Sequence, residues 1–500
     1  MNAGRLLSKL AADKAGETAL FFNESQYSYE RLNFLANTLA RHLAEYGIKQ
    51  GDCIAVMLPN CPEFAFIYFA TSKLGAVFCP IDIRLGAAES NQILSNTRTR
   101  ICFTFPELPH KDRLNQEVRN IDIAGEEFSS MLTDLADNRD ISTDVGADET
   151  ALYLHTSGTT GIPKMVELTF ANLDCFPKAM ENCIVRREEE VLGIILPMSH
   201  ISGPIILNLL LAEKCKLVII DSFNPLTLFE NIAKHRITYF HAVPPVFSLM
   251  LKSGLAERFD TSSLDIIAMM GTSVPVSLMN AFKNTFPHVV VLQGYGLTET
   301  SPLLTLTKRE DADLKRASIG TPVEGAEALV VDEHDRTLGV GEIGELIVKG
   351  PMVMKGYLDM PEQSSERIRN GYFYTNDLVK VDSDNYYYHM GRRNDMLVLA
   401  NGLNVYPAEI QNIIFSHPAV LDATVIGIHS AKQQGNILHA FVVPAPNAAL
   451  RDVDIRELCT KQLGSIKTPK KITLLESLPK TSTGKTDIRE LKKLAGDHEK

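Results

Sequence analysis

A run of nine residues from Thr156 to Lys164 is rich in hydroxyl groups and glycines and ends in Pro-Lys. Glycines let main-chain N–H groups approach phosphate oxygens closely, side-chain hydroxyls donate hydrogen bonds, and Lys164 adds a positive charge. The run lacks the glycine spacing and the Gly-Lys-Ser/Thr ending of a Walker A loop. It predicts a phosphate-binding loop of another kind, and the structural alternative is a flexible Gly/Thr turn. The predicted contacts are Thr156, Ser157, Gly158, Thr159, Thr160, Gly161 and Lys164.

A second segment, Gly294 to Thr300, places a tyrosine between two glycines and follows it with a threonine and a glutamate. The glycines let the Tyr295 ring lie flat against a planar base, while Thr298 can donate to a phosphate. Glu299 is a hard oxygen ligand of the kind that Mg2+ prefers. Outside such a pattern, the commoner fates are a core position for Tyr295 and a surface position for Glu299.

Three charged residues stand in further short motifs. Asp377 ends Tyr-Thr-Asn-Asp, and a carboxylate can accept hydrogen bonds from two hydroxyls at once. Arg392 belongs to Gly-Arg-Arg-Asn-Asp, and Lys485 ends Pro-Lys-Thr-Ser-Thr-Gly-Lys. A lysine in such a flexible loop can carry its charge into a site and withdraw again. The alternatives are an ordinary loop acid, a surface arginine and a solvated tail lysine.

These segments follow the order of the motifs in the adenylate-forming superfamily, which comprises acyl-CoA synthetases, aryl-CoA ligases, luciferases and the adenylation domains of peptide synthetases. The sequence resembles this superfamily over nearly its whole length, and the ordered set of motifs is highly specific. The resemblance implies an ATP-dependent acid:CoA ligase. Such an enzyme forms an acyl-adenylate from a carboxylic acid, here an aromatic or medium-chain acid, and then an acyl-CoA thioester.

The resemblance also implies a role for each motif. Asp377 accepts hydrogen bonds from both ribose hydroxyls, and Glu299 binds the Mg2+ that arrives with ATP. Negative charge on the phosphate oxygens is stabilised by Lys164 and Lys485. The implied nucleotide-binding residues also include Gly294, Tyr295 beside the adenine, Gly296, Thr298 and Arg392, and the implied catalytic set is Lys485, Lys164, Thr298 and Glu299.

The acid itself is not readable from the sequence. His200 falls where the superfamily places a residue beside the acyl carboxylate, although a core or helix-start histidine is nearly as common. A pocket lined by Met, Gly, Thr and Leu suits either an aryl ring or a medium acyl chain, so both stay open. The expected pocket residues are His200, Met270, Gly271, Thr272, Gly296 and Leu297.

By resemblance, the C-terminal domain rotates between the two half-reactions about a hinge at Asn394. Rotation removes Lys485 and brings up a loop of small side chains that leaves room for the pantetheine arm of CoA. The hinge is usually Asp or Lys, and an uncharged Asn suggests an altered balance between the two orientations. The expected CoA channel consists of Ala400, Asn401 and Gly402.

Three other positions depart from the usual motifs. Met165 follows the lysine where glycine is common, Phe170 replaces a frequent histidine, and Asn376 replaces a glycine. None of these changes removes a group that the chemistry needs.

Other functions share most of these residues. One alternative loads a carrier-protein thiol instead of CoA, and a luciferase-like oxygenation shares the first half-reaction. A nucleotide-binding sensor without catalysis is a third alternative. Retention of Lys164, Glu299 and Lys485 argues against the sensor.

Apolar periodicity predicts the elements that position these residues. Helices alternate with short apolar strands as far as about residue 292, which predicts α/β layers with a largely parallel sheet. After Gly320 the pattern changes to strands without helices, as in a β-rich subdomain. We therefore expect a large N-terminal AMP-binding domain (1–391) of α/β and β-rich subdomains, a hinge (392–395), and a small mobile α+β C-terminal domain (396–500).

Composition narrows the class further. The net charge of -11 and the lack of a Lys/Arg run argue against a nucleic-acid partner. Eight cysteines without a CxxC pair read as free thiols in a reducing, cytoplasmic setting, and no His/Cys cluster has zinc spacing. The apolar run Ile201 to Ala212 is too short for a membrane anchor and predicts a core helix. The expected partners are ATP, CoA and a small carboxylic acid, with an oligomer left open.

Overall fold

The computed structural model describes residues 2–133, 140–156, 164–181, 190–272, 274–393, 397–399, 404–430, 435–445, 448–479 and 486–496. Several predicted site residues lie outside these ranges, and their positions are not described. They are Ser157, Gly158, Thr159, Thr160, Gly161, Asn394, Ala400, Asn401, Gly402 and Lys485.

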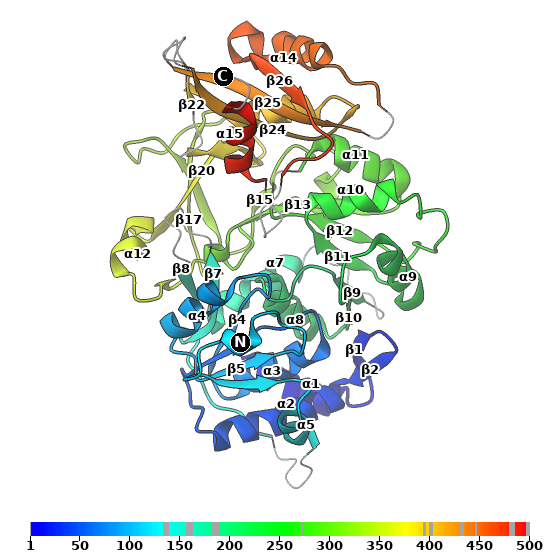
Figure 1. The fold of residues 1–500 in the computed structure, drawn as a ribbon, viewed down its shortest axis with the longest axis vertical. Helices are drawn as coiled ribbons and strands as arrows, with labels where there is room; N and C mark the ends of the chain where they lie inside the picture. The colour runs from blue at the N-terminus through cyan, green and yellow to red at the C-terminus, as the bar shows by residue number, and fades with distance from the viewer. Residues whose placement is uncertain are drawn as a thin grey trace.

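The N-terminal part of the chain contains a nine-stranded sheet, whose strands β9 to β13 are labelled in Figure 1. Its inner strands pair in parallel, whereas the pairs at both edges are antiparallel. In spatial order the strands are β15 (Thr321–Pro322), β14 (Thr305–Leu306), β13 (Val290–Tyr295), β12 (Ile266–Met269), β11 (Tyr239–Ala242), β9 (Val191–Ile194), β10 (Lys216–Ile219), β1 (Thr18–Phe22) and β2 (Ser25–Ser28).

A second, seven-stranded sheet lies in the same part, and four of its strand pairs are parallel. The antiparallel pairs are the β7–β8 hairpin and the pairing of the short strand β18 with β8. In spatial order the strands are β18 (Gly356–Tyr357), β8 (Lys164–Thr169), β7 (Thr150–Thr156), β4 (Val77–Pro80), β3 (Cys53–Val56), β5 (Ile101–Thr104) and β6 (Arg119–Asp122).

Helices α3 (Pro62–Lys73) and α8 (Ser202–Glu213) lie between the two sheets, because their side chains join one core with strands of both. Side chains alternate between faces along each strand. In β3, Ile54 and Val56 therefore enter this central core, while Cys53 and Ala55 face α4 (Ala87–Asn96). The outer face of the nine-stranded sheet is covered by α9 (Pro225–His235), α10 (Pro244–Lys252) and α11 (Val276–Thr285).

A third, five-stranded sheet is antiparallel throughout. It contains β16 (Glu327–Val331), β17 (Gly344–Lys349), β20 (Tyr372–Val381), β19 (Ile368–Arg369) and β21 (Tyr387–Arg392), with α12 (Pro361–Arg367) preceding β19. The change from parallel α/β layers to an antiparallel sheet confirms the predicted β-rich subdomain.

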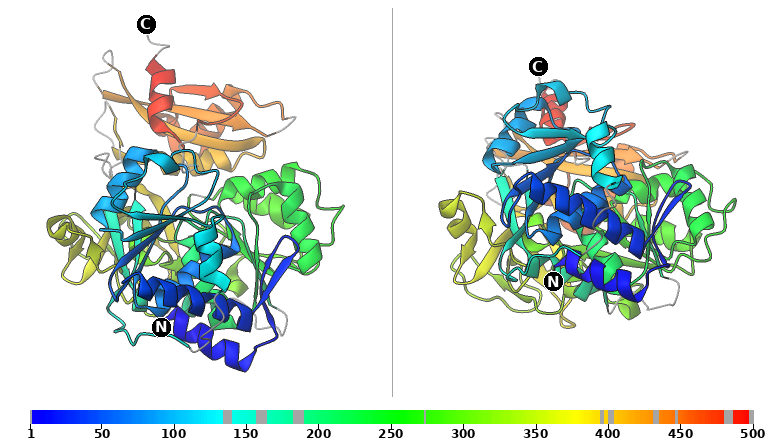
Figure 2. Two further views of the ribbon diagram at one scale, coloured as in Figure 1. Left: turned by 60° about the horizontal axis from the view of Figure 1, so that its bottom comes forward. Right: turned by 90° about the horizontal axis from the view of Figure 1, so that it is seen from below.

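The C-terminal elements gather at one end of the molecule, in orange and red in Figure 1, and both views of Figure 2 keep them together. They comprise β22 (Leu397–Val398), β23 (Asn404–Val405), α13 (Pro407–Phe415), β24 (Val420–Ser430), β25 (Gly435–Pro444), α14 (Asp452–Lys467), β26 (Lys471–Leu474) and α15 (Ile488–Gly496). This small α+β unit confirms the predicted fold class. The domain boundary at 391 and the hinge stay predictions.

The predicted core helix at Ile201 to Ala212 is α8, which is buried on nearly all sides. Among the described residues, no helix has the length and apolar character that crossing a membrane requires.

Lys73, at the end of α3, is a fully buried lysine that ties α1 (Ala3–Asp13) to the segment after residue 139. Its Nζ donates to Asp140 Oδ1 at 2.8 Å and to the Ser8 hydroxyl. Burial lowers the pKa of Lys73, and the bond to Asp140 opposes this shift. The ammonium is therefore held in the core by one half-exposed carboxylate.

We expect Asp140→Asn to lower the free energy of unfolding by about 2 kcal/mol, since it leaves a buried ammonium without its counter-charge while Asp140 itself is half exposed. Lys73→Met, which removes the buried charge altogether, is expected to cost less. Urea unfolding measures both variants. If Lys73→Met proved less stable than Asp140→Asn, the expectation would be wrong, because the buried ammonium would then stabilise the fold rather than merely need a counter-charge.

Candidate active site

The segment after β13 folds back tightly on itself. A Cβ added at Gly296 would lie 1.6 Å from the Pro302 carbonyl oxygen, so only glycine fits this close approach. The Leu297 N–H donates to Thr300 Oγ1 at 2.9 Å and fixes a short 3-10 turn, η2 (Thr298–Thr300). Tyr295 and Glu299 are thereby held at opposite ends of a rigid loop.

Tyr295 joins this loop to the five-stranded sheet. Its hydroxyl donates to Asp377 Oδ2 at 2.6 Å. The other oxygen, Oδ1, lies 3.2 Å from His389 Nε2 and 3.0 Å from Arg392 Nε. Burial, with only 1% of the residue exposed, would raise the pKa of Asp377, but the hydrogen bonds from His389 and Tyr295 and the charge of Arg392 outweigh it and hold this pKa below its usual value. Asp377 is therefore an ionised, preorganised acceptor.

Asn376 shows why the usual glycine before this aspartate can be replaced. Its φ is +59°, in the left-handed region that glycine and asparagine tolerate best. Its main-chain N–H donates to Glu345 Oε1 at 2.9 Å, which anchors the turn. Asparagine therefore adopts the backbone conformation that this position requires, and Asp377 stays in place.

Lys164 and Glu299 meet at one aromatic ring. The Tyr357 hydroxyl donates to Glu299 Oε1 at 2.9 Å, and Lys164 Nζ lies 5.0 Å from the centre of the Tyr357 ring. Thr156 faces Lys164 across the β7–β8 hairpin, so the two ends of the predicted phosphate loop are neighbours. Tyr357 and His389 were not predicted, because neither stands in a pattern that the sequence sets apart.

The predicted acyl-pocket residues follow the carboxyl ends of parallel strands in the nine-stranded sheet, where α/β proteins commonly bind ligands. His200 comes after β9, Gly271 and Thr272 after β12, and Leu297 after β13. A Cβ added at Gly294 would lie 3.3 Å from Met270 Cε, so the ends of β12 and β13 are in contact.

His200 contacts two residues that the sequence did not single out. Its Nε2 lies 3.4 Å from Asp82 Oδ2 and 3.3 Å from Arg84 Nη2. Burial raises the pKa of Asp82, but Arg84 and His200 outweigh that effect and lower it overall. Nearby, burial and the charge of His200 lower the pKa of His155 to about 4. His200 is therefore part of a polar cluster rather than an apolar core position.

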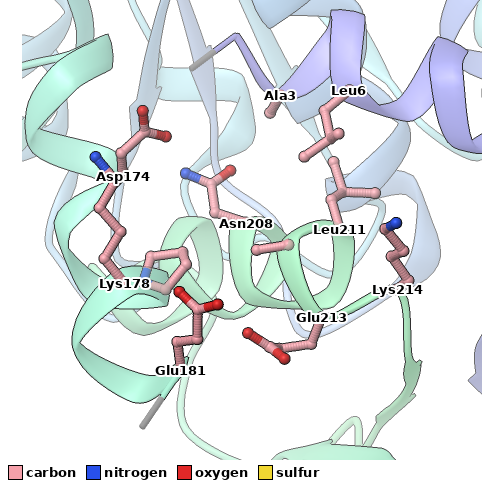
Figure 3. A pocket seen from close by; sticks show the side chains of 11 residues that line it. Ala3, Leu6, Asp174, Lys178, Glu181, Asn208, Leu211, Glu213 and Lys214 are labelled. Atoms are coloured by element: carbon pink, nitrogen blue, oxygen red, sulfur yellow. The ribbon is translucent and has the colours of Figure 1, made fainter. Parts of the chain in front are cut away.

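A separate cavity of about 270 Å3 lies among α1, α7 (Cys175–Glu181) and α8 (Figure 3). Charged side chains of both signs line it, including Lys178, Glu181 and Glu213. None of the predicted site residues that the structure describes lines this cavity, so it is distinct from the cluster described above.

The described elements form a large N-terminal part of α/β and β layers and a small α+β C-terminal unit. The profile of the AMP-binding enzyme family matches residues 7–358, and that of the AMP-binding enzyme C-terminal domain matches residues 409–485. The chain belongs to the AMP-binding enzyme family. The predicted membership of the adenylate-forming superfamily is confirmed.

The chain is similar along most of its length to proteins named as CoA ligases. It is 29% identical to a feruloyl-CoA synthase of Amycolatopsis, covering 94% of both chains. It is 30% identical to a long-chain-fatty-acid–CoA ligase of Mycobacterium tuberculosis, covering 92% of this chain and 91% of the relative. The o-succinylbenzoate CoA synthetase of Bacillus subtilis, solved with its acyl-adenylate intermediate, superposes with a TM-score of 0.85 at 26% identity, covering 97% of both chains. The predicted enzyme class, an acid–CoA ligase, is confirmed.

We expect Asp377→Asn to weaken ATP binding roughly thirtyfold, which corresponds to about 2 kcal/mol for a lost charge-assisted hydrogen bond. Calorimetric titration with a non-hydrolysable ATP analogue measures the change. The control is Asp384→Asn, which alters an exposed acid in the turn between β20 and β21. Equal losses in both variants would mean that Asp377 has no direct role in binding.

Proposed function

We propose that this enzyme activates an aromatic or medium-chain carboxylic acid with ATP and transfers the acyl group to CoA. One observation carries the proposal. The loop from Tyr295 to Glu299 contacts Asp377 at one end and, through Tyr357, reaches Lys164 at the other. Asp377, the proposed ribose acceptor, and Lys164, the proposed phosphate-binding cation, are thus linked by a single loop. A nucleotide likewise carries its ribose and its phosphates in one molecule, so it can contact both residues at once.

Asp377 and Lys164 each have a role in the first half-reaction. Asp377 accepts from the ribose hydroxyls, and Lys164 stabilises negative charge on the phosphate oxygens. The acid's carboxylate attacks the α-phosphorus of ATP and pyrophosphate leaves, so no protein nucleophile is needed. The predicted second lysine, Lys485, lies outside the described residues, and its role rests on its motif.

Mg2+ fits Glu299 by donor chemistry, since a carboxylate is a hard oxygen ligand and Mg2+ commonly binds through one or two carboxylates plus substrate phosphates. In the described part of the chain, no group of three or more His, Cys, Asp or Glu residues forms a metal site of its own. Glu299 would therefore hold an ion that arrives with ATP. When bound, Mg2+ neutralises charge on the phosphate groups.

The second half-reaction requires access for a thiol. We propose rotation about Asn394 and a pantetheine channel along Ala400, Asn401 and Gly402, as the motifs imply. In thioester formation, the thiol attacks the acyl carbonyl and AMP leaves. Seven described cysteines are free and buried, which supports a reducing, cytoplasmic setting for a CoA-dependent enzyme.

Two features support the proposed acid class. Relatives of the chain are named for feruloyl and long-chain fatty acyl substrates, and a structural neighbour carries an o-succinylbenzoyl adenylate. In this chain, Met270 packs beside Gly294, and Leu297 lies partly buried in the same region. Apolar side chains such as these suit contact with an aryl ring or an acyl chain.

A panel of aromatic, alicyclic and linear acids tests the function. We expect pyrophosphate release that depends on the acid and AMP turnover that rises when CoA is added, because the thiol discharges the adenylate. Pyrophosphate release without any acid would contradict the proposal. Turnover with a carrier protein but not with free CoA would show that the acceptor is a carrier-protein thiol instead of CoA.

We expect Lys485→Ala to lose adenylation while it still converts a supplied acyl-adenylate to the thioester. The reason is that Lys485 is proposed to act only on the phosphate groups of the first step. Pyrophosphate exchange measures the first half-reaction, and thioester formation from synthetic acyl-adenylate measures the second. Loss of both half-reactions would show that Lys485 does not act in the first step alone.

A further inference from the structure

Tyr357 stands between the two charged residues that the proposed function assigns to ATP. Only 6% of the residue is exposed, its hydroxyl bonds Glu299, and its ring faces Lys164. We propose that Tyr357 is a positioning residue that keeps Lys164 and Glu299 from pairing with each other, so that one stays available for phosphate and the other for a divalent cation. This inference rests on the proposed function.

The hydroxyl of Tyr357 acts as a donor. A carboxylate oxygen can only accept, so the phenol supplies the proton of this hydrogen bond. One hydrogen bond to Glu299 Oε1 fixes the orientation of the carboxylate and leaves Oε2 for another ligand. Hydrogen-bond partners that orient a metal-ligating carboxylate in this way commonly increase the affinity for the metal ion.

The ring of Tyr357 attracts the ammonium group of Lys164. An ammonium within about 6 Å of an aromatic centroid is attracted to the ring face, and Lys164 Nζ lies 5.0 Å from it. Opposite charges so close to one ring would otherwise attract each other directly. Among the residues that the structure describes, no ion pair joins Lys164 to Glu299.

The main chain holds Tyr357 in this position from several sides. Its strand β18 pairs with β8, where Tyr357 stands opposite Val166. Its N–H donates to Ser364 Oγ at 2.8 Å. The Met354 N–H donates to the Glu299 carbonyl at 2.9 Å, so the approach to β18 is also bonded to the loop that carries the carboxylate. The three side chains therefore meet through fixed backbone segments.

Tyr357→Phe tests the hydroxyl while keeping the ring. We expect the affinity for Mn2+, measured by electron paramagnetic resonance with a non-hydrolysable ATP analogue bound, to fall about tenfold. Binding of the same analogue without any divalent cation is expected to stay unchanged, because Lys164 still faces the ring. In a Glu299→Gln background, Tyr357→Phe is expected to have no further effect on Mn2+ affinity.

Tyr357→Leu tests the ring. Without it, Lys164 is expected to pair with Glu299, and binding of the cation-free ATP analogue is expected to weaken several-fold. Adding Glu299→Gln removes the competing carboxylate and should restore that binding, a recovery that a merely structural role of the ring would not produce.

The chain supplies a matched control in Tyr372, whose hydroxyl donates to Glu327 and whose ring faces Lys349 Nζ at 5.7 Å, away from the site. Tyr372→Phe is expected to leave both affinities unchanged. Measurements are made below the thermal midpoint of each variant.

Unchanged Mn2+ affinity in Tyr357→Phe, or no recovery in the Leu/Gln double variant, would overturn the inference. Wild-type protein that fails to bind the ATP analogue would instead overturn the proposed function.

Discussion

The site depends on keeping the carboxylate of Asp377 charged inside the protein. An unpaired charge at this depth would be strongly unfavourable, so donors must reach it from several directions. Tyr295 comes from the nine-stranded sheet, whereas His389 and Arg392 come from the strand next to Asp377 in the five-stranded sheet. The hydrogen bonds that stabilise the charge therefore also fix the two sheets against each other.

The same loop reaches the seven-stranded sheet through a second, partly buried contact. The bond between Glu299 and Tyr357 connects η2 to β18, at the edge of the seven-stranded sheet. Because Tyr295 and Glu299 lie on one tightly closed loop, the contact at Asp377 and the contact at Tyr357 are held at a set separation. All three sheets of the N-terminal part are therefore linked through one short segment, Tyr295 to Glu299.

Continuous apolar runs in the sequence predicted several fully buried elements, because such runs have no polar face to turn toward water. The apolar runs that became α3, α8, β3 and β12 are examples. Such patterns carry no signal for Tyr357, which sits in a two-residue strand with no period to detect. Its bond to Glu299 and the contact of His200 with Asp82 span more than 50 residues, so they arise only when distant segments pack.

The partners of Asp377 constrain how the proposed nucleotide can bind. A carboxylate offers about four lone-pair positions, and the hydrogen bonds from Tyr295 and His389 use two of them. The two positions that remain match in number the two ribose hydroxyls of the proposed nucleotide. Arg392 pairs with the same carboxylate as an ion, and half of its side chain is exposed while that of His389 is mostly buried. Because Arg392 uses its charge here and no hydrogen bond to Asp377, its N–H groups stay available for the nucleotide contact that its motif implies.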